Sequence, residues 1–445
     1  MTPGCTIQLF CNGIWHDVAT VALWGAEGDG WQARTYCGYA VDWAVNFPGA
    51  RDAHALSCQF AVGLEPLSLT HWPVFLIDML PQGFGREEIL RRINLPVTAA
   101  EGVDWRLLQA GAGNPIGNLR VKEAAEWLSH NTGAVRGFTD DEVASRGEDF
   151  TEFLAGHGLF VAGSSGVQGE WPKLLLTRAQ DGLLYLDHTL ADAQAAEHYI
   201  VKFGRGNNPT LANILRHEAP YMALARQLGL RVHAALVLKQ RALFIRRFDR
   251  VVQSGGVTRL AQESIACLTG MPGFGAVPSH DRVCRELMTR CTHPEAEVLE
   301  YIKRDVANLA LGNKDNHARN TALQRDFDGV VRLTPLYDFA PMLLHPDGIA
   351  RRIRWVDNDA GSPDWGRVVS RVCDISAQVQ PKVRGKHRKS VPLVRREVLV
   401  AGLKAMVPAL REIAQSGDQM GLDSALLAHL RAGILLQAQR LSDLK

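Results

Sequence analysis

The sequence predicts an α+β fold in which a β-rich lobe precedes a helix-rich lobe. Short apolar runs separated by turn residues recur between residues 173 and 250, which is typical of strands. Beyond residue 279 the apolar residues take helical spacing, over 279–291, 295–311 and most of 395–441. The 445 residues are also too many for one hydrophobic core.

We therefore expect three parts. Residues 1–150 would form an N-terminal accessory α+β subdomain, residues 151–255 a β-rich nucleotide-binding lobe, and residues 256–445 a helix-rich catalytic lobe. The polar stretch 130–150 marks the first boundary, and Thr139 begins a pattern typical of a helix N-cap.

The N-terminal part mixes strand and helix signals. Residues 6–15 alternate in part and contain Asn12-Gly13, a strong signal for a β-hairpin turn. Helical spacing follows at 85–94 and continues from Trp105. We expect this region to carry no chemistry of its own.

Composition describes an ordinary globular protein. Hydrophobic residues make up 46% and the net charge is +2, so composition gives no reason to expect bulk binding to nucleic acid or membrane. The eight cysteines include no Cys-x-x-Cys pair, and no secretion signal is visible, which favours reduced thiols. No run approaches the roughly 18 apolar residues of a membrane helix, so a cytoplasmic protein is expected.

One short stretch predicts chemistry. Asp315 and Asn320 are separated by four residues, and Asp338 follows after the length of a short β-hairpin. This spacing suits phosphoryl transfer, in which one carboxylate faces a hydroxyl nucleophile while an amide and a second carboxylate hold Mg²⁺. A catalytic site at Asp315 is therefore predicted.

The upstream chain holds the other parts that such a site needs. A Gly-rich segment, 156–169, lets backbone N–H groups approach phosphates, although it lacks the Walker pattern. Lys202 near a strand end could pair with ATP phosphates or simply reach to water. Glu218, in a helical segment, could pair with Lys202 or be solvated, and Pro220 should mark a first turn or a kink. The ordered set predicts a protein-kinase-like bilobal fold.

The same residues resemble a known family. Residues 311–320, Leu-Gly-Asn-Lys-Asp-Asn-His-Ala-Arg-Asn, with Leu-Thr-Pro-Leu-Tyr-Asp at 333–338, closely resemble the signature of HipA-type serine/threonine kinases, which are toxins of bacterial toxin–antitoxin modules. Further similar segments, which extend the resemblance over nearly the whole chain, are 75–82, 107–119, 199–203, 243–250 and 262–263.

The resemblance implies a role for each matching residue. Asp315 would be the catalytic base, and Asn320 and Asp338 would bind Mg²⁺. The cofactor ATP would contact Lys202, which Glu218 could orient, and would meet the hinge backbone from Arg246 to Phe248. In the Gly-rich loop the residues implied are Gly166, Val167 and Gln168.

The chain departs from the family pattern in two places. Gly163 stands where relatives carry an autophosphorylated serine, so Ser164 and Ser165 beside it are the candidates for that modification. The lysine of the same loop pattern comes late, as Lys173, and Arg246 stands where an acidic residue is frequent.

The resemblance implies an ATP-dependent protein kinase that phosphorylates a protein target to inhibit growth and is neutralised by a small helix-turn-helix antitoxin. Relatives act on aminoacyl-tRNA synthetases, but the sequence selects no substrate. The basic segment Lys382 to Arg396 could contact DNA within the antitoxin complex, or be a solvated loop. A small-molecule or lipid kinase on the same residues, and a catalytically idle module that binds DNA with its partner, stay open.

Overall fold

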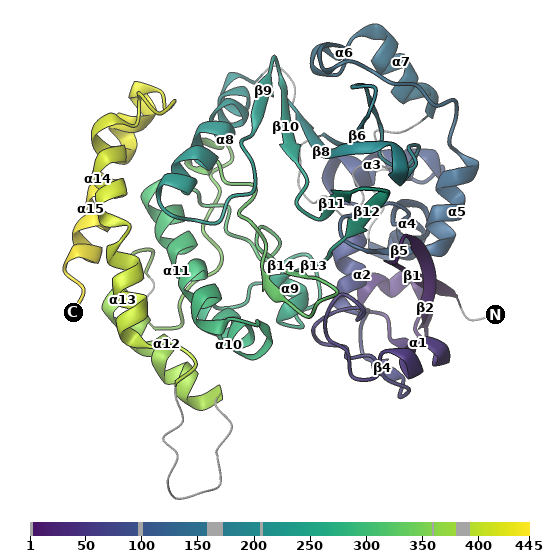
Figure 1. Ribbon diagram of the computed structural model, residues 1–445, viewed down its shortest axis with the longest axis horizontal. Helices are drawn as coiled ribbons and strands as arrows, with labels where there is room; N and C mark the ends of the chain where they lie inside the picture. The colour runs from purple at the N-terminus through teal and green to yellow at the C-terminus, as the bar shows by residue number, and fades with distance from the viewer. Residues whose placement is uncertain (1–2, 97–100, 158–171, 205–207, 358–359, 380–391) are drawn as a thin grey trace, which may run out of the picture. The chain divides into compact units, whose positions relative to one another are not determined.

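The computed structural model describes residues 3–96, 101–157, 172–204, 208–357, 360–379 and 392–445 (Figure 1). The chain forms two compact units. Unit 1 comprises Met1–Asn207, Leu236–Gly275 and Gln324–Gly329, and unit 2 comprises Asn208–Ala235, Ala276–Leu323 and Val330–Lys445. Because the chain crosses between them several times, neither unit is one continuous segment. The expected three-part division stays a prediction.

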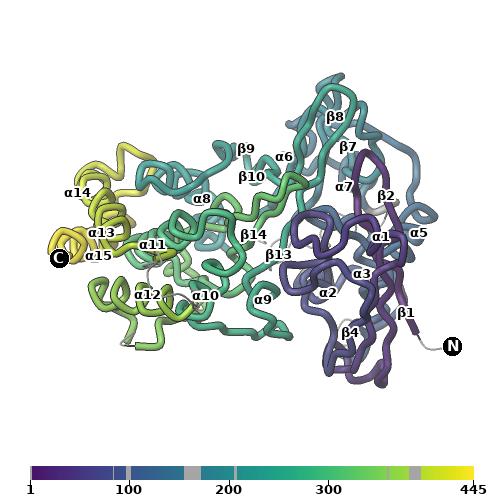
Figure 2. Tube along the Cα trace, turned by 60° about the horizontal axis from the view of Figure 1, so that its bottom comes forward, coloured from purple at the N-terminus to yellow at the C-terminus, as the bar shows by residue number. Residues whose placement is uncertain are grey.

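Unit 1 begins with a five-stranded antiparallel sheet of order β4-β3-β2-β1-β5. Strands β1 and β2 lie side by side at the purple end of the chain (Figure 2). The predicted hairpin is confirmed, because Asn12 and Gly13 have φ values of 51° and 81°, the positive pair that a type I′ turn requires. The strands are β1 (Gly4–Cys11), β2 (Ile14–Leu23), β3 (Thr35–Tyr39), β4 (Leu67–Leu69) and β5 (Leu119–Val121).

Helices pack on this sheet through a large apolar core. The fully buried rings of Trp72 and Trp105 meet edge to face, with centroids 5.0 Å apart. The two predicted helices are confirmed as α3 and α4, since their apolar residues Ile89, Leu90 and Leu108 enter this core. The helices are α1 (Val41–Asn46), α2 (Val74–Met79), α3 (Gly83–Arg92), α4 (Asp104–Gly111) and α5 (Lys122–His130).

A second five-stranded antiparallel sheet in unit 1 has the order β7-β6-β8-β10-β9. Its strands are β6 (Lys173–Ala179), β7 (Leu184–Leu186), β8 (Ala195–Phe203), β9 (Val237–Lys239) and β10 (Ala242–Arg246). Helices α6 (Asp140–Ser145) and α7 (Glu148–His157) precede it. The predicted N-cap is confirmed, because Thr139 and Glu142 form a reciprocal capping box. All five strands lie in the range 173–250, where the sequence predicts strands.

The remaining elements of unit 1 are tied to its N-terminal part by buried charges. Glu263 forms an ion pair with Arg325 (3.1 Å) and accepts a hydrogen bond from the backbone N–H of Cys58 (2.9 Å). Arg325 also donates to the carbonyl of Ala55 at 3.1 Å. These elements are β11 (Arg250–Gln253), β12 (Gly256–Arg259), β13 (Ala261–Ser264) and α9 (Ile265–Leu268), and β14 (Ala322–Arg325) runs into unit 1 from unit 2.

Unit 2 is mainly helical, and its last two helices pack together (Figures 1 and 2). The helices predicted at 279–291 and 295–311 are confirmed as α10 and α11, with Ser279 as the N-cap of the first. The elements are α8 (Pro209–Gln227), α10 (His280–Arg290), α11 (Pro294–Ala310), β15 (Val331–Leu333), α12 (Trp365–Val379), α13 (Arg396–Lys404), α14 (Val407–Ser416) and α15 (Ser424–Ser442).

Helix α8 contradicts one of the two alternatives predicted for Pro220, a first turn, and the other, a kink, stays a prediction. It begins at Pro209 behind an Asn208 N-cap and continues through Pro220 to Gln227, so Pro220 does not mark a first turn. Burial outweighs the missing backbone N–H, since Tyr221 and Leu224 just beyond Pro220 are both almost fully buried. Across the described ranges of the chain, no helix has the length and apolar character that a membrane span requires.

Candidate active site

The predicted catalytic stretch lies in unit 2, in the loop that follows α11. The helix ends at Ala310, and Gly312 turns the chain with a φ of 67°. Two contacts fix this turn: the Tyr221 hydroxyl donates to the Leu311 carbonyl at 2.8 Å, and the Leu343 N–H donates to the Gly312 carbonyl at 3.0 Å. The loop therefore leaves a rigid helix end along a defined path.

Asp315 and Asn320 meet through the backbone. The Asn320 side chain donates from Nδ2 to the Asp315 carbonyl at 2.8 Å, and the Asn320 N–H donates to the His317 carbonyl at 3.0 Å. Among the described residues, none donates a hydrogen bond to the amide oxygen of Asn320. The Asp315 side chain is 29% exposed, and its Oδ1 lies 3.7 Å from Nε2 of His317. The loop thus positions the Asp315 carboxylate and the Asn320 amide oxygen and leaves both available to a ligand.

Two further asparagines hold the loop, and sequence reasoning missed them. Asn316 donates from Nδ2 to the Ile353 carbonyl (2.9 Å), and its Oδ1 accepts from the Arg352 N–H (2.8 Å). Asn313 donates to Oδ1 of Asn308 (2.9 Å) and accepts from the Asp315 N–H (3.3 Å). The concentration of asparagine in this loop was the available signal, because short amides readily bond to the backbone.

Asp338 adopts a conformation that is rare for its residue type. Its φ is 52°, in the left-handed region, which costs of the order of 1–3 kcal/mol unless the surroundings impose it. The surroundings do so on both sides. The Tyr337 hydroxyl donates to the Arg319 carbonyl at 2.8 Å, and the buried ring of Phe339 contacts Tyr221 with centroids 5.5 Å apart. Such fixed strain is typical of functional positions.

Oxygen donors of this kind fit Mg²⁺, which prefers carboxylate and amide oxygens. In the ranges that the structure describes, no three His, Cys, Asp or Glu side chains are grouped to hold a metal ion. The predicted set has only two carboxylates, Asp315 and Asp338, because its third oxygen belongs to the amide of Asn320. Such a set leaves several coordination positions of one Mg²⁺ ion to water and phosphate oxygens.

Lys202 lies in unit 1, near the end of β8. It is only 5% exposed, so its ammonium group does not simply reach to solvent. Its direct partners in the sheet are Lys173 on β6 and Leu243 on β10. Residues directly opposite in an antiparallel pair share a face, so this face carries two buried lysines. Positive charge at such a position suits a phosphate group.

The predicted hinge residues Arg246 and Phe248 differ in environment. Arg246 is exposed and pairs through Nη2 with Oε1 of Glu197 at 3.1 Å. The carbonyl of Phe248 accepts a hydrogen bond from Nε2 of Gln324 at 3.0 Å. One carbonyl of the expected adenine-binding backbone is therefore already engaged within unit 1.

Next to these two residues lies a buried ion network, which we call the 249 cluster: Asp187, Arg247, Asp249 and Arg250. Asp249 accepts from Arg247 (2.7 and 2.9 Å), from Arg250 (2.7 Å) and from the backbone N–H of Gly117 (2.8 Å). Burial alone would raise the pKa of Asp249, but the Arg247 and Arg250 guanidiniums hold that pKa well below its usual range. Burial lowers the pKa of Arg250 to about 9, and the Arg247 charge acts in the same direction.

Glu218 lies on α8 in unit 2 and is 2% exposed, so it is not a solvated helix residue. Its pairing with Lys202 stays a prediction. Arg395, at the end of the basic segment, forms an ion pair with Glu295 at 2.6 Å. Outside the described residues lie Ser164, Ser165, Gly166, Val167, Gln168 and residues 382–391 of the basic segment.

Replacing Gly312 with alanine is expected to destabilise the protein by about 1–3 kcal/mol. A Cβ at this position would collide with the Leu343 side chain, in addition to the strain of the positive φ. Urea unfolding measures the change. Gly348→Ala is the matched control, because Gly348 has the same φ of 67° and open space around it. Equal losses in the two variants would contradict the role of the Leu343 contact.

Residues 165–385 match the model of the family described as "HipA-like C-terminal domain". These residues include β6, β8 and β10, the 249 cluster, and the loop with Asp315, Asn320 and Asp338. This part of the chain is thus a HipA-like C-terminal domain, and the resemblance to HipA-type proteins, predicted from the sequence, is confirmed.

Two known proteins extend this finding. "Putative kinase Y4mE" of Sinorhizobium fredii (strain NBRC 101917 / NGR234) is 26% identical over 307 residues, which cover 64% of this chain and 65% of that relative. HipA of Shewanella oneidensis MR-1, solved with HipB and operator DNA, has a TM-score of 0.63 at 19% identity over 99% of this chain and 98% of its own. The predicted α+β, kinase-like fold is therefore confirmed.

Proposed function

We propose that this protein is an ATP-dependent phosphotransferase whose catalytic base is Asp315. The observation that carries the proposal is the 315–320 loop, in which Asn320 closes onto the backbone of Asp315 and leaves both oxygen donors available. The strained Asp338, fixed by its neighbours, adds the second carboxylate. The similarity to a relative named as a kinase supports the same class of activity.

Each residue has a defined task in this proposal. The Asp315 carboxylate accepts the proton of the attacking hydroxyl. Asn320 and Asp338 would hold Mg²⁺, which supplies neutralisation of the phosphate charge. Lys202 contributes a further positive charge to ATP phosphates, with the hinge around Arg246 and Phe248 meeting the adenine. Gly166, Val167 and Gln168 would line the phosphates from the loop before β6.

We further propose that the acceptor is a serine or threonine of a protein and that the protein acts in the cytoplasm as a growth-inhibiting toxin. Autophosphorylation at Ser164 or Ser165 would regulate it. The Shewanella HipA complex contains HipB and operator DNA, which supports a small DNA-binding antitoxin as partner. The basic segment Lys382 to Arg396 would contact DNA only within such a complex. An aminoacyl-tRNA synthetase is a candidate substrate.

The test is phosphate transfer from labelled ATP. Purified full chain, with Mg²⁺ and with or without cell lysate, is followed by mass spectrometric mapping of phosphate. Phosphoserine or phosphothreonine on the chain or on a lysate protein, absent when Mg²⁺ is chelated, is the expected result. Phosphate found only on small molecules would point to a small-molecule kinase. Nucleotide binding with no transfer to anything would contradict the proposal and favour the idle DNA-binding module.

A further inference from the structure

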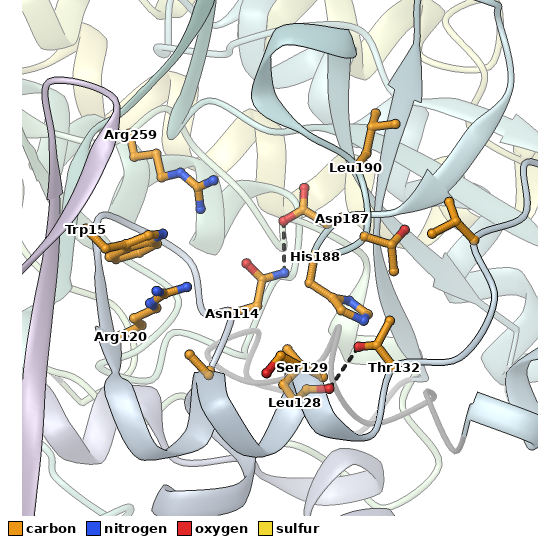
Figure 3. Close-up of a pocket in the computed structure, with 14 residues that line it drawn as sticks. Trp15, Asn114, Arg120, Leu128, Ser129, Thr132, Asp187, His188, Leu190 and Arg259 are labelled. Carbon is orange, nitrogen blue, oxygen red and sulfur yellow. Dashed lines mark hydrogen bonds between the residues drawn. The ribbon is translucent and has the colours of Figure 1, made fainter.

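Unit 1 contains a pocket of about 380 Å³ whose lining includes none of the residues of the proposed active site (Figure 3). Three segments far apart in the sequence supply its polar wall: Trp15 on β2, Arg120 on β5 and Arg259 at the end of β12. Helix α5, the segment that follows it and the loop after β7 supply other walls, with Thr132 and His188 among them. A pocket of this size is in the range of small-molecule sites, roughly 300–1,000 Å³.

The polar wall is a stack of charged and aromatic groups. The Arg120 guanidinium lies 4.0 Å from the centroid of the Trp15 ring, and that of Arg259 lies 5.1 Å from the same ring. Figure 3 shows Trp15 between the two arginines. Arg259 also covers Phe10 at 4.4 Å. Two positive charges are thereby held on one indole, at fixed positions beside the pocket.

Arg120 has a neutral hydrogen-bond partner rather than an acidic one. Its Nε donates to Oε1 of Gln8 at 2.8 Å, and Gln8 in turn donates to Asp17 at 2.7 Å. The carboxylate of Asp17 is held instead by Lys122, at 2.7 Å. Within the described residues, Arg120 forms no ion pair, and its terminal nitrogens have no hydrogen-bond partner.

Arg259 is only partly neutralised. Its Nη2 donates to both oxygens of Asp192, at 3.0 and 3.3 Å. The carboxylate that lines the pocket, Asp187, belongs to the 249 cluster, where Arg247 binds it at 3.2 Å. Burial and the neighbouring Arg259 charge together lower the pKa of Arg120 to about 10, so Arg120 stays protonated at neutral pH.

We propose that this pocket binds a small organic oxyanion, with the charged group held by Arg120 and Arg259. The planar guanidinium fork of Arg120 matches the geometry of a phosphate monoester or a carboxylate. The far walls include the apolar side chains of Ala125, Leu128, Val135 and Leu190, which suit a compact apolar body on the anion. The inference does not depend on the proposed kinase activity.

The test uses the full chain and three probes, phenyl phosphate, benzoate and inorganic phosphate, in calorimetric titrations at constant ionic strength. Arg120→Gln is expected to weaken binding of the preferred organic probe by about tenfold or more, because a charge-assisted hydrogen bond is lost. Arg259→Gln should weaken it in the same direction. The stronger of phenyl phosphate and benzoate identifies the oxyanion, and weaker binding of inorganic phosphate would support the apolar wall.

Two further variants complete the test. Arg136→Gln is the matched control: Arg136 also covers an aromatic ring, Phe138, at 4.9 Å, and it does not line the pocket, so binding should be unchanged. Ser129→Trp places a large side chain at the exposed, pocket-lining Ser129 and should block the probes while both arginines stay in place. Failure of wild type to bind any probe, or equal binding by the Arg120→Gln and Arg136→Gln variants, would overturn the proposal.

Discussion

Replacing Asp315 with asparagine is expected to slow phosphate transfer from ATP by about 10²–10⁴-fold, because general-base catalysis is lost. The substitution is nearly isosteric. Both hydrogen bonds that Asp315 forms in the loop use its backbone, the N–H to Asn313 and the carbonyl to Asn320, so the loop should keep its path. Single-turnover transfer and nucleotide affinity, measured separately, should show a loss in the rate alone.

Asp347→Asn is the control for this variant, because Asp347 lies in a nearby loop of unit 2 with its side chain 86% exposed. It makes the same chemical change and should transfer phosphate at the wild-type rate. Transfer by Asp315→Asn at the wild-type rate would remove Asp315 from the chemistry. Asp338→Asn would then be the next variant to examine.

Replacing Asp249 with asparagine is expected to lower the free energy of unfolding by about 3–5 kcal/mol, which is the usual cost of removing one partner from a buried ion pair. Arg247 and Arg250 are 0% and 1% exposed in their side chains, so neither can turn to water when the carboxylate is lost. Urea unfolding of the two proteins measures the difference.

The pH dependence gives an independent check. The pKa of Asp249 is lower in the folded than in the unfolded chain. The carboxylate therefore contributes its full share of the free energy of unfolding above the unfolded pKa of about 3.9, and this share is lost as pH falls toward the folded-state pKa. The difference in the free energy of unfolding between wild type and Asp249→Asn should therefore decrease below about pH 4. Asp149→Asn, which breaks an exposed pair with Arg136, should cost much less, and a similar cost in both variants would contradict the buried network.

Local signals predicted local structure well. The Asn12-Gly13 turn, the Thr139 capping box and the helix after Ser279 each depend on a few neighbouring residues, and the sequence shows all of them. The spacing of Asp315 and Asn320 is local too, since one hydrogen bond joins the two residues. Pro220 lies inside α8 and not in a first turn, because burial of this helix, which the sequence does not display, outweighs the local cost of proline.

Contacts between distant segments could not be predicted in this way. Asp249 accepts a hydrogen bond from Gly117, which is 132 residues away, and no sequence pattern around either residue indicates this partner. The pocket of Trp15, Arg120 and Arg259 is assembled from three separate strands, so the expectation that residues 1–150 carry no chemistry rested on motifs alone. Sheet register determines which of these distant residues come into contact, and it depends on the packing of the whole core.

The buried bonds of the 249 cluster and of Arg325 bear on how the chain could be shortened. A fragment limited to residues 165–385, the part that matches the family, would lack Gly117, Cys58 and Ala55, the backbone partners of Asp249, Glu263 and Arg325. Each loss would remove one hydrogen bond from a buried charged group. The part of the chain that matches the family model therefore takes backbone partners for its buried charges from the segment between residues 55 and 117.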